Sequence, residues 1–155
     1  MKRSIYTAHV RVTGGRDNGR GRTPDGMLDL PLRLPKELGG TGDGANPEQL
    51  FAIGYAGCFE AVMIVGAQRL GIPREQIADV SIDARVMLLA REDRRFELGV
   101  ELDIELPSLT DQGLATQLVR ASHQLCPYSN ATRGNIDVTL TVNGVAVTEL
   151  EPLPA

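Results

Sequence analysis

Two cysteines are the residues of this 155-residue chain whose type points most directly to chemistry. Cys58 lies within an apolar stretch, and Cys126 opens a polar segment rich in turn-forming residues, where a thiol can be reached and can move. A thiolate attacks oxygen and sulfur, and two thiols convert reversibly into a disulfide. The pair indicates thiol redox chemistry. Two plainer interpretations stay open: an inert buried thiol at Cys58, and a static disulfide between Cys58 and Cys126, which the cytosol disfavours.

A reactive Cys58 needs a positive charge from outside its own helix. Its neighbours at helical spacing are apolar or aromatic, and such surroundings raise the pKa of a thiol. The start of the expected helix is about three turns away, beyond the reach of the helix dipole. Arg16, Arg20 and Arg22 on a glycine-rich loop are the candidate cations, although a solvated basic loop is the plainer interpretation.

Two other kinds of site are weakly indicated. The glycine loop over 39–44 lacks the lysine of a P-loop and the spacing of a dinucleotide-binding loop, which favours a plain mobile loop. His123 and Cys126 form only a weak metal-ligand pair, because structural zinc requires four ligands. We interpret His123 as a partly exposed helix residue, and we expect neither a metal nor a cofactor.

Composition restricts the class of protein. The net charge of −4 argues against a nucleic-acid or anionic-membrane partner, and two cysteines are too few for a disulfide-rich secreted scaffold. The basic N-terminal residues precede no apolar signal segment, so a cytoplasmic location is expected. The apolar stretch over 50–67 contains Glu60 and is slightly short for a membrane span. It is expected to be the buried central helix of a soluble protein.

Hydrophobic periodicity predicts an α+β fold in which mostly antiparallel sheets pack on two main helices. Alternating apolar residues predict strands over 4–13, 28–34 (interrupted at Pro31), 80–90, 96–106, 136–142 and 145–150. Capping residues and a following Gly or Pro predict a long apolar helix from Asn46 to Leu70 and a second helix from Thr110 to the residue before Pro127. Residues 14–22 are expected to form a loop. No linker or repeat divides the chain, so one domain over 1–155 is expected.

Three segments carry a resemblance to a known family. They read TGGRD at 13–17, NPEQLFA at 46–52 followed by GYAGCF at 54–59, and CPYSNATRGNI at 126–136. Together they resemble the organic hydroperoxide resistance (Ohr) family of the OsmC-like superfamily, in order and over nearly the whole chain. The third segment is specific to the hydroperoxide-resistance branch.

The resemblance implies a thiol-dependent peroxidase that reduces organic hydroperoxides, including those of fatty acids. It implies that Cys58 is the peroxidatic nucleophile and Cys126 the resolving thiol that closes a disulfide with it. It further implies that Arg16 lowers the pKa of Cys58, and that Glu48 holds Arg16 over the sulfur through a bidentate ion pair.

The resemblance also implies partners and assembly. The disulfide would be recycled by a dithiol, such as a dihydrolipoyl group on a lipoylated enzyme, with no cofactor. The family fold is an intertwined homodimer, consistent with the apolar helix over 50–67. The alternative is a non-catalytic protein of OsmC-like fold that binds an apolar ligand or senses oxidants.

Overall fold

The computed structural model describes residues 3–15 and 17–148. The chain divides into two compact units, of which the first ends at Leu50 and the second begins at Phe51. Arg16 lies outside the described residues, as do the last two positions of the strand expected over 145–150. The single domain expected over 1–155 stays a prediction.

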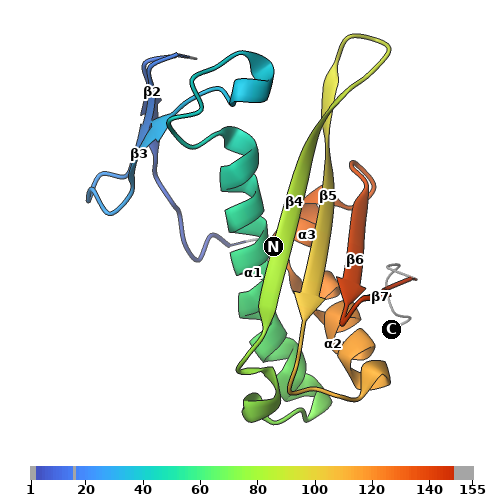
Figure 1. Ribbon diagram of the computed structural model, residues 1–155. Coiled ribbons are helices and arrows are strands. Elements are labelled where there is room, and N and C mark those ends of the chain that lie inside the picture. Colours follow the sequence, from blue (N-terminus) through green and yellow to red (C-terminus); the bar gives the residue numbers. More distant parts are fainter. Residues whose placement is uncertain (1–2, 16, 149–155) are drawn as a thin grey trace. The chain divides into compact units, whose positions relative to one another are not determined.

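The first unit contains a three-stranded antiparallel sheet in the order β1-β2-β3 (Figure 1). Its strands are β1 (Arg11–Thr13), β2 (Gly19–Arg22) and β3 (Asp29–Leu32), followed by the 3-10 helix η1 (Lys36–Leu38). The first strand is much shorter than the expected 4–13. Pro31 does not interrupt β3: it pairs with Arg20, and β3 is an edge strand, where a missing N–H can face away from the ladder.

The prediction of a loop over 14–22 is wrong for its second half, because Gly19–Arg22 form the central strand β2. The carboxylate of Asp29 on β3 forms ion pairs with two arginines of this strand. It lies 2.6 Å from Arg20 Nε and 2.8 Å from Arg22 Nη2. Gly14 makes the tight turn before β2 possible, since its φ is +84° and a Cβ there would collide with the carbonyl of Asn18. The sequence interpretation weighed the glycines as loop formers and overlooked these cross-strand pairs.

Helix α1 (Pro47–Leu70) starts as the capping residues predict. The Asn46 N–H donates to Gln49 Oε1 at 3.0 Å, and the Gln49 N–H donates to Asn46 Oδ1 at 2.8 Å. Gly71 ends the helix with φ at +69°. By length and composition alone α1 could cross a membrane. One face of it, however, contributes buried side chains to the protein core, so we interpret it as the core helix of a soluble protein.

The second unit has a four-stranded sheet in the order β4-β5-β6-β7. Its strands are β4 (Ser81–Ala90), β5 (Phe96–Glu105), β6 (Val138–Val142) and β7 (Val145–Ala146), and the 3-10 helix η2 (Arg74–Ile77) precedes β4. The β4–β5 hairpin is confirmed, whereas β5 and β6 run parallel. The parallel pair requires a crossover, which α2 (Gln112–Leu125) and α3 (Pro127–Thr132) supply.

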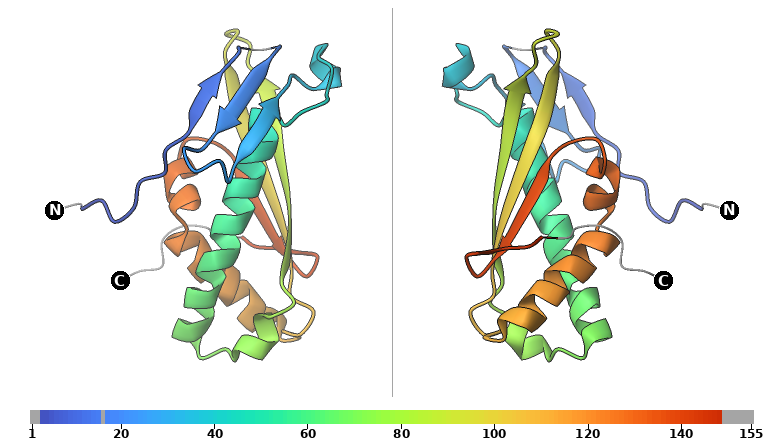
Figure 2. Two further views of the ribbon diagram at one scale, coloured as in Figure 1. Left: turned by 90° about the vertical axis from the view of Figure 1, so that its left-hand side faces the viewer. Right: turned by 90° about the vertical axis from the view of Figure 1, so that its right-hand side faces the viewer.

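Helices α1, α2 and α3 lie on one face of this sheet (Figure 1), and the turned views of Figure 2 show the same two layers. The buried core between them includes Tyr55, Phe59, Met63, Val100, Leu102, Ile104, Leu118, Val119, Cys126 and Leu140. The open face is polar: Arg85 pairs with Glu101 at 2.7 Å and also with Asp103. The hairpin thus has one wet face, and the α+β class is confirmed.

Two local predictions in the second unit need correction. Asp111, not Thr110, caps α2, because its carboxylate accepts the Leu114 N–H at 3.0 Å. The segment after Cys126, expected as an irregular turn region, forms α3, with Pro127 at its first position. Proline is favoured there because the first helical N–H has no partner within the helix.

Candidate active site

The two cysteines lie together within the second unit. Cys58 sits in the middle of α1, and Cys126 is the residue between α2 and α3, with φ of −66° and ψ of 122°. Both thiols are free, and the Cys126 S–H points to Cys58 Sγ with 3.6 Å between the sulfurs. A disulfide requires about 2.05 Å between sulfurs, so only a small approach separates this pair from a bond.

The burial of the two thiols differs from the sequence interpretation. Cys126 was expected to be accessible and mobile, yet it is 0% exposed, because α3 folds its segment onto the core. Cys58 is half-buried and is therefore the thiol that a molecule from solvent meets first. This order of access fits a nucleophile at Cys58 and a partner behind it at Cys126.

The electrostatics of Cys58 favour the neutral thiol. Burial raises the pKa of Cys58 above its ordinary value, and the hydrogen bond and proximity of Cys126 raise it further. The backbone amide of Tyr128 acts in the opposite direction and lowers this pKa, but its effect is the smallest of these. No cation affects this pKa within the described part of the chain. Formation of a thiolate therefore depends on a charge supplied from elsewhere.

An aromatic cluster packs beside the thiol pair. The rings of Tyr55 and Tyr128 stack with centroids 5.5 Å apart, and Phe51 meets Tyr128 edge-on at 5.7 Å. Gly54 makes room for this packing, because a Cβ there would lie 2.5 Å from the Tyr128 hydroxyl oxygen and 3.1 Å from Cζ. A glycine on α1 thus lets Tyr128, whose backbone amide lowers the pKa of Cys58, pack beside the thiols.

The variant Gly54→Ala is expected to displace Tyr128, with the backbone amide that lowers the pKa of Cys58, and to slow oxidation of Cys58 about tenfold, because a hydrogen bond to a charged group contributes about 1.5–3 kcal/mol. Stopped-flow measurement of Cys58 oxidation by cumene hydroperoxide tests this. Adding Tyr128→Phe removes the colliding oxygen and should restore most of the rate. A Gly54→Ala rate equal to that of the unmodified protein would show that Tyr128 placement does not matter.

A buried hydroxyl network joins α1 to α3. The Tyr55 hydroxyl donates to Ser129 Oγ at 3.0 Å and lies 3.3 Å from Thr132 Oγ1. Burial raises the pKa of Tyr55, which keeps this hydroxyl protonated and able to donate. The network fixes α3, and with it Cys126, against the helix that holds Cys58. Sequence reasoning missed Ser129 and Thr132, although their spacing of three would have placed them on one helical face.

Arg133 and His123 complete the support of Cys126. Arg133 donates to the His123 carbonyl at 3.0 Å and to Asn130 Oδ1 at 2.8 Å, joining the end of α2 to α3. His123 is buried rather than partly exposed, and its Nδ1 has no hydrogen-bond partner in the described structure. Burial, assisted by the positive charge of Arg133, lowers the pKa of His123 to about 4.

This histidine predicts a loss of stability in acid. An unfolded histidine has a pKa of about 6.5, so below that pH the unfolded chain binds a proton that folded His123 does not take up until about pH 4. The contribution of neutral His123 to the free energy of unfolding is thus intact above about pH 6.5 and declines as the pH falls toward 4. Because of this histidine, the free energy of unfolding should be about 2 kcal/mol lower at pH 5 than at about pH 7.5. Urea unfolding of His123→Leu should show a correspondingly flatter pH profile, and the exposed His9→Gln should not.

Which arginine supplies the positive charge beside Cys58 stays a prediction. Arg16 lies outside the described residues, whereas Arg20 and Arg22 are both paired with Asp29. Glu48 lies half-buried in the first turn of α1, the same helix that holds Cys58. In the described ranges no group of three or more His, Cys, Asp or Glu side chains is gathered that could hold a metal ion.

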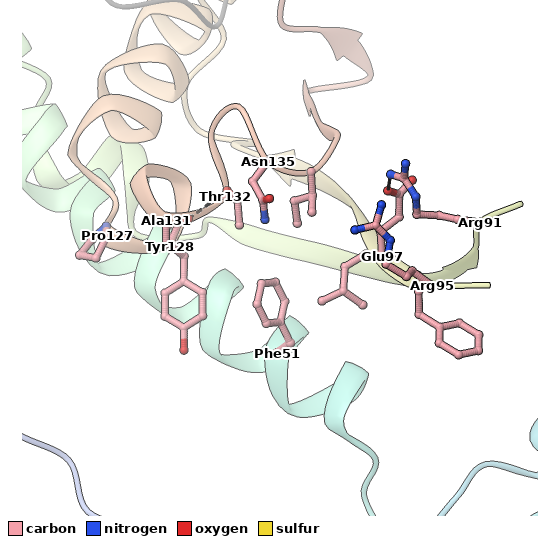
Figure 3. Close-up of a pocket in the computed structure, with 12 residues that line it drawn as sticks. Phe51, Arg91, Arg95, Glu97, Pro127, Tyr128, Ala131, Thr132 and Asn135 are labelled. Atoms are coloured by element: carbon pink, nitrogen blue, oxygen red, sulfur yellow. Dashed lines mark hydrogen bonds and ion pairs between the residues drawn. The ribbon is translucent and has the colours of Figure 1, made fainter. Parts of the chain in front are cut away.

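A cavity of about 640 Å³ lies in the same unit as the thiols, beside α3. Pro127 and Tyr128, which directly follow Cys126, line one part of it, and Phe51 of α1 lines its centre (Figure 3). Its volume falls in the range of about 300–1,000 Å³ that is usual for small-molecule sites. Neither cysteine lines this ligand-sized cavity, but the two residues that directly follow Cys126 do.

Comparison with known proteins adds to this geometry. A sequence model of the family described as OsmC-like protein matches residues 40–141, a range that contains both cysteines. An organic hydroperoxide resistance protein of Xanthomonas axonopodis pv. citri is 50% identical over 141 residues, covering 89% of this chain and 94% of the relative. The organic hydroperoxide resistance protein OhrB of Bacillus subtilis is 41% identical over 138 residues, covering 88% and 97%.

Solved structures agree. The crystal structure of an organic hydroperoxide resistance protein from Legionella pneumophila has a TM-score of 0.83 and 46% identity, covering 90% of this chain and 98% of that one. An α+β protein whose core helix holds a half-buried thiol against a second, buried thiol is a candidate two-cysteine redox protein. The chain belongs to the OsmC-like family, among the organic hydroperoxide resistance proteins.

Proposed function

We propose that this protein is a thiol-dependent peroxidase that reduces organic hydroperoxides, both alkyl and fatty-acid hydroperoxides, in defence against oxidative stress. The proposal rests on one observation above all: two free sulfurs lie 3.6 Å apart in a chain related to organic hydroperoxide resistance proteins. Apolar and aromatic surroundings at the thiols favour an alkyl group over hydrogen peroxide.

In the first step, the Cys58 thiolate attacks the terminal oxygen of the hydroperoxide. A sulfur–oxygen bond forms, the O–O bond breaks, and the alkoxide leaves and takes up a proton to become the alcohol. The peroxide is reduced by two electrons, and Cys58 becomes a sulfenic acid. The half-burial of Cys58 supports its assignment as the attacking residue, because Cys126 has no access to solvent.

In the second step, Cys126 attacks the sulfur of the sulfenic acid. A disulfide forms, the S–O bond breaks, and water leaves with the Cys126 proton. The short distance between the sulfurs supports this step, since condensation competes with over-oxidation of the sulfenic acid by a second peroxide. A dithiol, such as a dihydrolipoyl group on a partner enzyme, then reduces the disulfide by exchange.

Arg16 is proposed as the cation that stabilises the Cys58 thiolate, with Glu48 as its anchor. The raised pKa of Cys58 supports the need for such a charge. Arg16 is chosen over Arg20 and Arg22 because only Arg16 lies in the TGGRD segment at 13–17 that carries the resemblance. The guanidinium also offers several donors to the peroxide oxygens in a fixed geometry, which lysine does not.

The remaining proposals concern assembly and location. We propose an intertwined homodimer in the cytoplasm, without cofactor. Support for the dimer comes from apolar side chains that α1 exposes within the single chain, Ile53 at 70% and Ile64 and Val65 at 40% each. Such residues are typical of a helix that a partner subunit covers.

The function is tested by supplying cumene hydroperoxide or tert-butyl hydroperoxide to the reduced protein with dihydrolipoamide. Peroxide consumption should continue over many turnovers, with one dihydrolipoamide oxidised for each hydroperoxide. Binding of an apolar ligand without consumption would instead support the non-catalytic protein of the same fold. Consumption with other dithiols but not with dihydrolipoamide would exclude only the proposed reductant.

A further inference from the structure

The cavity beside α3 has chemically different ends. Figure 3 shows Pro127, Ala131 and Tyr128 at one end, and the side chains of Arg91, Arg95 and Glu97 grouped at the other, with Phe51 between them. The walls between the ends are largely apolar, with Leu98 and Ile136 contributing. The Pro127–Tyr128 end is the one nearest in the chain to the thiol pair, because these two residues directly follow Cys126 and the Tyr128 backbone lies close enough to Cys58 to lower its pKa. The cavity is thus apolar in its length, with the residues that follow Cys126 at one end and arginines at the other.

The arginine end combines two guanidinium groups with the two carboxylates that pair with them. Arg91, Arg95 and Glu97 line it, whereas Asp93, which also pairs with the arginines, does not. Arg91 donates to Glu97 at 2.6 Å through Nη1, and Arg95 donates to Asp93 through Nε at 3.0 Å and Nη2 at 2.7 Å. In the described ranges, Arg91 Nη2 and Arg95 Nη1 have no hydrogen-bond partner, so each guanidinium retains donors for a ligand.

These ion pairs present little resistance to a ligand. The Arg91 and Arg95 side chains are 47% and 75% exposed, and ion pairs at such exposure are weak. A carboxylate offers the two oxygens that match a guanidinium fork, and arginine binds it more specifically than a lysine would. An alkyl chain alone fills the apolar length of the cavity but leaves these donors unused.

We propose that the cavity binds hydroperoxides that carry a carboxylate at the far end of an alkyl chain, with Arg91 and Arg95 binding the carboxylate. The two arginines thereby set a preference for free fatty-acid hydroperoxides over neutral ones of the same length. This inference rests on the proposed function and assigns its substrate preference to two residues on the β4–β5 hairpin.

The test compares the hydroperoxide of linoleic acid with that of methyl linoleate, which has the same chain without the charge. The unmodified protein should show a kcat/KM about tenfold higher for the acid, because hydrogen bonds to a charged group are strong. R91Q/R95Q should remove that preference and leave the ester and cumene hydroperoxide unchanged. Raising the ionic strength should reduce the preference in the unmodified protein only.

Arg94→Gln is the matched control, because Arg94 lies on the same hairpin but does not line the cavity. It should retain the full preference for the acid, and Arg95→Lys should retain part of it. Equal kcat/KM values for acid and ester in the unmodified protein would overturn the inference. An equal loss for both substrates in R91Q/R95Q would do so as well, because the arginines would then only maintain the fold.

A binding measurement separates this inference from the proposed function. Linoleic acid, which has no peroxide to reduce, should displace a fluorescent fatty acid from the reduced protein about tenfold more weakly in R91Q/R95Q than in the unmodified protein. That result without any peroxide turnover would contradict the peroxidase and leave the carboxylate site standing. Peroxide turnover with arginine-independent binding would contradict the carboxylate site alone.

Discussion

The Cys58→Ser protein is expected to reduce organic hydroperoxides no faster than the uncatalysed reaction. A serine hydroxyl is not ionised near neutral pH, and oxygen does not form the sulfenic acid through which the proposed cycle passes. Cys126 cannot substitute for the missing thiol, because it is fully buried behind Cys58. Rapid mixing with cumene hydroperoxide, followed by assay of the remaining peroxide, measures this loss.

Cys126→Ser is the matched control for that variant, and its behaviour should differ in kind. Cys58 still attacks, so one hydroperoxide per chain is consumed before the reaction stops at the sulfenic acid. Without the second sulfur nearby, the sulfenic acid should proceed to sulfinic acid under excess peroxide. A burst in Cys58→Ser and none in Cys126→Ser would exchange the two roles.

Arg16→Ala is expected to raise the pKa of Cys58 and to slow its oxidation at neutral pH about a hundredfold. Burial and the Cys126 thiol already raise this pKa, so the thiolate has little stabilisation once the proposed cation is removed. A preorganised charge at a reacting centre contributes about 10²–10³-fold in rate. The rate of Cys58 oxidation, followed by stopped flow across pH, gives both the pKa and the limiting rate.

Arg20→Ala and Arg22→Ala provide controls on the same segment. Each removes an exposed arginine already paired with Asp29, and each should leave the pKa and the rate close to those of the unmodified protein. Glu48→Ala should act in the same direction as Arg16→Ala but more weakly, because it frees the arginine without removing it. A larger defect in Arg20→Ala than in Arg16→Ala would move the role to Arg20.

The elements that could be predicted are those with strong local signals. The Asn46–Gln49 capping box, the glycine at the end of α1 and the alternating residues of β4 and β5 each define their element without help from distant residues. Strand β2 could not be found in this way, because its GRGR sequence has no alternating apolar pattern. Its pairing on both sides, and the shared Asp29, come from the neighbouring strands.

In the candidate site, too, the features with a local sequence signal could be predicted, and those that depend on tertiary packing could not. The types and segments of Cys58 and Cys126 indicate a thiol pair, and the structure brings them together. The burial of Cys126 was not predictable, because it follows from α3 packing onto α1 through Tyr55, Ser129 and Thr132. Burial of His123 likewise depends on how α2 meets the sheet, which helical periodicity alone left undecided.

The most direct test of the two-cysteine peroxidase is a single turnover without reductant. Reduced protein is mixed with one equivalent of cumene hydroperoxide per chain, quenched with an alkylating agent, and analysed by peptide mass spectrometry. One alcohol and one Cys58–Cys126 disulfide within each chain are expected for every hydroperoxide consumed. Consumption of hydroperoxide with both cysteines recovered as alkylated thiols would contradict it.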